Sequence, residues 1–213
     1  MKYNSLVELV GAMECFDLAL LIQAFGEPHE VVRVQLSRWM KGGKVIGLRR
    51  GMYALSDSHR RVSLVPARLA NQLYHPSYLS GLWALAFYDM IPERVVWLTS
   101  VTTRVPRRFE NTIGTFDYRN IKQSAFFGYA AIPYSGREIL VAEREKALLD
   151  HWHLTPGEWT QERLEEMRYQ NRQQVNKDRL RAYADRFQST RLCRAVKRWL
   201  TSGEEEEKGD VTL

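Results

Sequence analysis

Cysteine is scarce in this chain of 213 residues: Cys15 and Cys193 are the only two, far apart and outside any Cys-x-x-Cys or Cys/His spacing. This excludes a disulfide-stapled scaffold and argues against a zinc site. No stretch approaches the roughly 20 apolar residues that a membrane-spanning helix requires. Glu8 and Glu14 interrupt the apolar N-terminal stretch, unlike a signal peptide. We therefore expect a cytoplasmic protein with reduced thiols and no membrane partner.

Sequence signatures of catalysis are also missing. There is no Gly-rich phosphate loop, no Gly-x-Ser-x-Gly elbow and no His-Glu-x-x-His motif. We accordingly predict no cofactor, no bound metal and no catalytic residues, and a protein that is not an enzyme.

Basic residues exceed acidic ones, with 31 Lys and Arg against 25 Asp and Glu and a formal net charge of +6. This balance favours a polyanionic partner such as nucleic acid. The excess is concentrated within residues 28–61, where only Glu30 and Asp57 are acidic. The basic residues of this stretch are Arg33, Arg38, Lys41, Lys44, Arg49, Arg50, Arg60 and Arg61.

Local signals predict three short helices before residue 42. Ser5 is a suitable N-cap for the first helix, and Asp17 for a second helix over residues 18–25. Gly26 ends that second helix, and Pro28 fits as the first residue of the third.

The third helix is amphipathic on a 3.6-residue wheel. Its apolar sector holds Val32, Leu36, Trp39 and Met40. Its outward face is mainly basic and consists of Glu30, Arg33, Val34, Ser37, Arg38 and Lys41. After a break at residues 42–43, residues 44–55 read as two strands that turn near residues 49–51. Three helices and a basic hairpin predict a winged helix-turn-helix over residues 1–58.

The rest of the chain predicts a second domain over residues 62–200, after a polar linker at residues 57–61. Helical stretches are expected within residues 64–90, interrupted by His75-Pro76, and again over residues 142–154 and 160–200. The expected strands are residues 95–101, 113–121, 127–132 and 138–141. Residues 201–213 contain four consecutive glutamates and are expected to form an acidic disordered tail. The predicted fold class is α+β: a winged helix-turn-helix followed by a mixed α/β domain that ends in helices.

The third helix and the hairpin are the predicted DNA-binding site. A helix in the major groove needs donors for base edges, and its flanking hairpin needs cations for the backbone. We expect Arg33 to contact a base, because the guanidinium fork matches guanine. The other expected contacts, mainly to phosphates, come from Arg38, Lys41, Lys44, Arg49 and Arg50, with His29, Val34 and Ser37 as lesser base-edge candidates. The competing interpretation is that these are solvated surface charges.

Several segments resemble the antitoxin component of AbiE abortive-infection toxin-antitoxin systems. They are residues 39–55 (WMKGGKVIGLRRGMYAL), 70–93 (ANQLYHPSYLSGLWALAFYDMIPE), 99–104 (TSVTTR), 113–118 (IGTFDY) and 142–150 (AEREKALLD). The resemblance spans most of residues 1–154. It implies a transcriptional regulator that represses its own promoter on double-stranded DNA. It also implies a C-terminal domain that counteracts a nucleotidyltransferase-like toxin in phage defence, without stable toxin binding. We expect a monomer or weak dimer.

Two alternative functions belong to other classes. The first is a metal-dependent nucleic-acid-processing enzyme that uses Asp117, Glu143, Glu145 and Lys146. Against it, Glu143 and Lys146 lie one helical turn apart, where surface ion pairs are common. His151 and His153 are interpreted as structural or exposed rather than as metal ligands. The second alternative is a winged-helix protein-interaction module.

Two further patterns allow a nucleic-acid role but favour a structural one. An aromatic cluster could stack on single-stranded bases, but its helical spacing favours core packing. Its members are Tyr74, Tyr78, Trp83, Phe87 and Tyr88. The basic helices over residues 163–198 could contact phosphates. We interpret them instead as the solvated faces of a helical cap.

Overall fold

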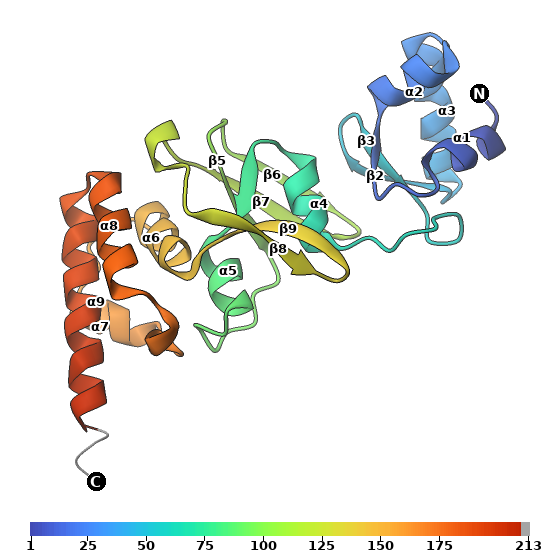
Figure 1. Ribbon diagram of the computed structural model, residues 1–213. Helices are drawn as coiled ribbons and strands as arrows, with labels where there is room; N and C mark the ends of the chain where they lie inside the picture. The colour runs from blue at the N-terminus through green and yellow to red at the C-terminus, as the bar shows by residue number, and fades with distance from the viewer. Residues whose placement is uncertain (210–213) are drawn as a thin grey trace.

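The computed structural model describes the backbone of residues 1–209 and the side chains of residues 1–203. The protein is α+β, as predicted. Figure 1 shows a small N-terminal unit at one end, a sheet-containing unit in the middle and a helical layer at the other end. We call the first unit, residues 3–55, the head, and the part formed by residues 66–209 the body; residues 56–65 connect the two. None of the helices in residues 1–209 has the length and apolar character needed to cross a lipid bilayer.

The head consists of three helices and one small antiparallel sheet. Its strand order is β1-β3-β2, so the hairpin strand β3 lies in the middle. The elements are α1 (Tyr3–Val10), β1 (Phe16–Asp17), α2 (Leu18–Phe25), α3 (His29–Lys41), β2 (Val45–Arg49) and β3 (Met52–Leu55).

Local chemistry sets most of the boundaries in the head. Asp17 caps α2 by accepting a hydrogen bond from the Leu20 amide at 2.8 Å, as predicted. Gly26 ends α2 at a φ of 63°, which favours glycine. The predicted cap at Ser5 is wrong, because α1 already begins at Tyr3. The pattern of apolar residues fixes the face of a helix but not the residue at which it begins.

A compact apolar cluster holds the head together. Leu6, Leu21, Val32 and Leu36 are fully buried and join the three helices. Met40, predicted to lie in the buried sector of α3, is 37% exposed because it lies in the last turn of that helix, beyond most of the cluster.

The body is built on a six-stranded mixed sheet. The strand order is β6-β7-β5-β4-β9-β8, with β5 parallel to β7 and β4 parallel to β9. The strands are β4 (Ser77–Leu79), β5 (Leu98–Thr102), β6 (Arg107–Asn111), β7 (Gly114–Asn120), β8 (Tyr129–Tyr134) and β9 (Arg137–Ala142). Four of them match predicted strands. The sequence did not predict β4, which has only three residues, or β6, which is mostly charged.

Helices cover the sheet and close the far end of the body (Figure 1). They are α4 (Pro66–Leu73), α5 (Gly81–Phe87), α6 (Arg144–Leu154), α7 (Gln161–Glu166), α8 (Lys177–Phe187) and α9 (Thr190–Gly209), with 3-10 turns η1 (Gln123–Ala125) and η2 (Arg172–Gln174). The predicted disordered tail began at residue 201, but α9 continues to Gly209. Glutamate is a good helix former, and the apolar face that ends with Trp199 and Leu200 anchors the preceding turns. Residues 210–213 lie outside the described part of the chain.

A buried ion pair lies between α6 and the sheet. The side chains of Lys146 and Asp150 are one helical turn apart, form an ion pair and are both 0% exposed. Tyr78 and Ser80, which flank the end of β4, donate to Asp150 Oδ2 at 3.1 and 2.7 Å. Lys146 Nζ also donates to the Tyr78 hydroxyl at 2.8 Å. The expectation that Lys146 is a surface residue paired with Glu143 is therefore wrong, since the pair that forms is internal.

The head is attached to the body by polar contacts of the segment before β1 and by apolar contacts of the hairpin. Glu14 is 3% exposed and accepts a hydrogen bond from Arg68 of α4 at 2.6 Å. Burial, followed by the negative charge of Glu14, raises the pKa of Cys15 to about 11. Its protonated thiol donates to Gln72 at 3.1 Å. Leu48 and Ala54 of the hairpin belong to the apolar core of the body rather than to that of the head.

We expect Asp150→Ala to lower the free energy of unfolding by about 3 to 5 kcal/mol, because Lys146 is left buried without its counterion. Urea denaturation measures this change. Lys146→Met combined with Asp150→Leu should restore much of the loss, since an apolar pair needs no counterion. Asp178→Ala is the matched control: Asp178 pairs with Arg181 at 3.0 Å on the surface, and its loss should change the free energy by less than about 1 kcal/mol. An equal effect of the two alanine variants would contradict a structural role for the buried pair.

His151 should make the protein less stable in mild acid. Burial, followed by the nearby positive charge of Arg163, lowers the pKa of His151 to about 4. Unfolded histidine takes up a proton near pH 6.5, so the unfolded state is favoured as the pH falls from 6.5 towards 4. At pH 5 this contribution is about 2 kcal/mol relative to neutral pH. Unfolding measured at pH 7 and pH 5 should show that much less pH dependence in His151→Gln than in the original protein. Equal pH dependence would contradict a neutral buried imidazole.

Candidate nucleic-acid interface

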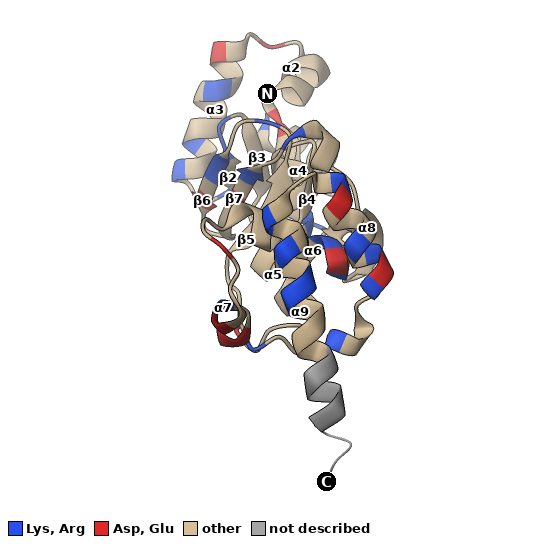
Figure 2. Ribbon diagram, turned by 90° about the vertical axis from the view of Figure 1, so that its left-hand side faces the viewer, with Lys and Arg blue, Asp and Glu red and all other residues tan. Residues whose placement is uncertain are grey.

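The outward face of α3 presents most of the predicted contact residues to solvent. Val32 and Leu36 fix the orientation of the helix because both are fully buried in the head. The opposite face is exposed along His29, Arg33, Val34, Arg38 and Lys41, and Ser37 is half-buried at its margin. In Figure 2 the basic residues of α3 follow one side of the head. The structure thus brings six of the nine predicted residues onto one helix face.

The first turn of α3 is partly neutralised within the helix. Glu30 lies 3.1 Å from the His29 imidazole and 3.3 Å from the Arg33 guanidinium. The hydrogen bond from His29, followed by the charge of Arg33, lowers the pKa of Glu30 below its usual value. Arg33 remains exposed but is already oriented by a carboxylate. A base contact by Arg33 would exchange that surface ion pair, which is worth little in water.

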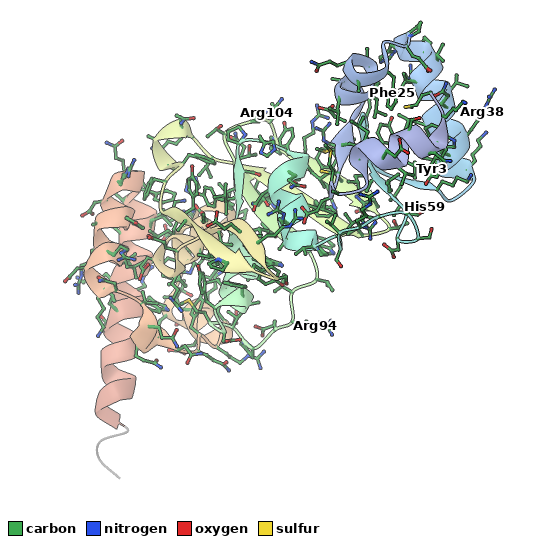
Figure 3. All side chains as sticks on the ribbon, turned by 45° about the vertical axis from the view of Figure 1, so that its right-hand side comes forward. Tyr3, Phe25, Arg38, His59, Arg94 and Arg104 are labelled. Carbon is green, nitrogen blue, oxygen red and sulfur yellow. The ribbon has the colours of Figure 1, made fainter. Side chains whose placement is uncertain are left out.

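The last turns of α3 carry charge that the protein does not neutralise. Arg38 and Lys41 are exposed and have no ion-pair partner among the described side chains. Figure 3 shows Arg38 on the outer side of the head, directed away from the body. Lys44 follows directly, with its ammonium 4.8 Å from the centre of the Tyr3 ring. Arg38 and Lys41 are therefore available to a polyanion at no cost in ion pairs, whereas Lys44 already contacts an aromatic ring.

The two arginines at the hairpin turn have different surroundings. Arg50 is exposed, as a phosphate contact requires. Arg49 is half-buried, and its Nε donates to the Leu73 carbonyl of α4 at 2.6 Å. Its Nη1 donates to the Arg50 carbonyl at 3.0 Å. Arg49 is therefore hydrogen-bonded to the body. In this it differs from Arg50, the other predicted DNA contact at the hairpin turn.

The carboxylates of the alternative enzyme site are used in packing. The Glu143 carboxylate accepts a hydrogen bond from Tyr183 at 2.6 Å, and Glu145 accepts one from the Asn176 amide at 2.7 Å. Asp117 lies on β7, 3.7 Å from Arg119. Across the described residues, no three His, Cys, Asp or Glu side chains converge in a way that could hold a metal ion. The structure therefore does not bring Asp117, Glu143 and Glu145 together as a metal-dependent nuclease would require.

The five aromatic residues of the predicted cluster pack within or against the core of the body, although Tyr78 lies in β4 and not on a helix. Tyr74 and Tyr78 are buried, and Trp83, Phe87 and Tyr88 pack against the same cluster. Trp83 stacks on Phe87 with ring centroids 5.5 Å apart. The core interpretation thus holds for Tyr74 and Tyr78, whereas Trp83, Phe87 and Tyr88 are half-buried at the edge of the core.

The sequence did not reveal one group of exposed cations in the body. Arg104 lies just before β6 and Arg107 is its first residue, and both side chains are exposed. The only signal was the local run of arginines at residues 104–108, which no motif connects to the head.

Comparison with known proteins leaves the family open: no protein-family model matches the chain, and no curated protein matches its sequence. The resemblance to AbiE antitoxins therefore stays a prediction.

Arg49 should behave as a structural residue and Arg50 as a solvent-exposed one. Arg49→Ala removes a charged hydrogen bond across the head–body contact, so we expect the free energy of unfolding to fall by about 1.5 to 3 kcal/mol. Arg50→Ala, the matched neighbour, should change it by less than about 0.5 kcal/mol. Urea denaturation of both variants measures the difference. Equal stability of the two would show that the contact to Leu73 contributes nothing.

Proposed function

We propose that this chain is a DNA-binding transcriptional repressor whose head is a winged helix-turn-helix, with α3 as the recognition helix. The observation that carries the proposal is the exposed basic face of α3, on which Arg38 and Lys41 have no ion pair among the described residues. A duplex in contact with this face would neutralise charge that the protein leaves unpaired.

The order of elements in the head supports this assignment. A helix, a short strand, two further helices and a two-stranded hairpin follow one another, and the first strand pairs with the hairpin. In helix-turn-helix proteins the second helix of the motif enters the major groove, and its N-terminal residues reach base edges. In the head, α2 would be the first helix of the motif and α3 the second.

The residues of α3 divide into two roles along the helix. Arg33 and Val34 lie in its N-terminal half, where a guanidinium can bind guanine and an apolar side chain can contact a thymine methyl group. Arg38, Lys41 and Lys44 lie at or beyond its C-terminal half and are suited to phosphates. Base contacts would give sequence preference, whereas phosphate contacts would give affinity.

We further propose that the repressor acts on its own promoter as the antitoxin of an AbiE-type system, countering a nucleotidyltransferase-like toxin without forming a stable complex. The support is the sequence resemblance described above. Its segment at residues 142–150 contains Lys146 and Asp150, which form the buried pair of α6. The resemblance thus includes residues that stabilise the body as well as residues exposed on the head.

Fluorescence anisotropy with a duplex from upstream of the protein's own coding sequence tests the DNA-binding function. Arg38→Ala and Lys41→Ala should weaken binding to this duplex and to unrelated DNA alike. Each should reduce the slope of log affinity against log salt by about 0.9, the value for one lost phosphate contact. Arg33→Ala should cost about 1 to 3 kcal/mol on the upstream duplex only.

Arg94→Ala is the matched control, because Arg94 is exposed on a body loop away from the head (Figure 3). It should bind like the original protein. If unrelated competitor DNA abolishes binding to the upstream duplex, the proposal of a sequence-specific repressor is contradicted. Wild-type binding by the double variant of Arg38 and Lys41 would contradict the placement of the interface on α3.

A further inference from the structure

A second basic surface adjoins the hairpin of the head. It consists of Arg50 at the hairpin turn and of Arg104 and Arg107, which flank residues 105–106 before and at the start of β6. All three side chains are exposed. We call these three residues the adjoining basic surface.

Contacts around the end of α4 bring its two parts together. The hairpin reaches this point through Arg49, whose Nε donates to the Leu73 carbonyl at 2.6 Å. The next residue, Tyr74, donates from its hydroxyl to the Val105 carbonyl at 3.1 Å. A third contact joins β2 to β6, from Asn111 Nδ2 to the Leu48 carbonyl at 2.9 Å. The turn that holds Arg50 and the segment that holds Arg104 are thus attached to consecutive residues.

The surface is both ordered and unneutralised. The Arg104 guanidinium lies 4.6 Å from the centre of the Tyr74 ring and donates to the His75 carbonyl at 3.0 Å, contacts that orient it without cancelling its charge. Arg50 and Arg107 have no ion pair among the described residues. By contrast, Arg108 on the same strand is paired with Glu110 at 2.9 Å.

We propose that the adjoining basic surface is a second contact for the DNA backbone, so that the body and the head grip one duplex together. The proposal rests on the function proposed for α3 and extends its footprint. Figure 2 shows α3, β2 and β6 toward the same side of the molecule. A duplex seated on α3 and continuing past the hairpin would bring phosphates to Arg104 and Arg107. Those contacts add affinity and register but no base preference.

The test uses a double variant that carries both Arg104→Gln and Arg107→Gln. Its control is the single variant Arg94→Gln. Binding is measured by fluorescence anisotropy on a duplex of about 30 base pairs, three helical turns, between 50 and 200 mM salt. The double variant should reduce the salt slope by about 1.8, that is 0.9 for each lost phosphate contact. The preference for the upstream duplex over unrelated DNA should stay unchanged. Arg94→Gln should match the original protein.

Duplex length gives a second readout. On a duplex of about 12 base pairs, little more than one turn, the double variant and the original protein should bind equally, because such a duplex covers α3 alone. Hydroxyl-radical footprinting of the longer duplex should show lost protection on one flank only. Arg107→Glu serves as a variant that leaves the Tyr74 contact of Arg104 intact, so a loss of affinity in this variant does not come from losing that contact.

The outcomes separate the two proposals. A double variant with the salt slope of Arg94→Gln, while Arg38→Ala and Lys41→Ala lose affinity, overturns the second contact and leaves the α3 interface standing. If the α3 variants keep full affinity and the double variant loses it, the α3 interface fails and the body is the DNA-binding surface. Full affinity in both sets overturns both.

Discussion

The Lys146 and Asp150 charges lie in the centre of the body without any solvent exposure, and the surrounding structure must satisfy both of them. The partners come from several elements: Tyr78 and Ser80 supply hydroxyls beside β4, and the Phe187 ring of α8 lies 4.8 Å from the ammonium. Each hydrogen-bond donor around the pair matters, because without it a charge would be buried in an apolar environment without compensation. The pair therefore connects α6 to both the sheet and the helical layer.

The position of the head depends on the body in turn. Its hairpin lies against β6, and Glu14 lies between Arg68 of α4 and Arg137 of β9, 2.6 and 3.8 Å away. Because the contacts come from several strands and helices, the orientation of α3 is fixed relative to the sheet. A DNA duplex bound to α3 would have the body beside it rather than tethered at a distance.

The sequence predicted elements whose signals are local and missed those that tertiary contacts decide. The Asp17 cap, the Gly26 stop and the hairpin turn each follow from a few neighbouring residues, and the structure has all three. Strand β4 has only three residues, and its pairing with two distant strands leaves no periodic trace. The burial of Lys146 and the hydrogen bond from Arg49 to Leu73 were likewise unpredictable, because lysine and arginine side chains are mostly exposed. Tyr78 and Leu73, which bind these two side chains, lie far from them in sequence. For the candidate site, the pattern identified the face of α3 but not which hairpin cation was free.

The shared core also bears on how this chain can be divided. Leu48 and Ala54 are hairpin residues by sequence but belong to the apolar cluster of the body. In a fragment cut at the linker near residue 58, both side chains would become exposed apolar surface. Glu14 would lose its ion pairs with Arg68 and Arg137. The head is therefore one side of an intramolecular interface, and a dissected fragment would tend to self-associate through that newly bared patch.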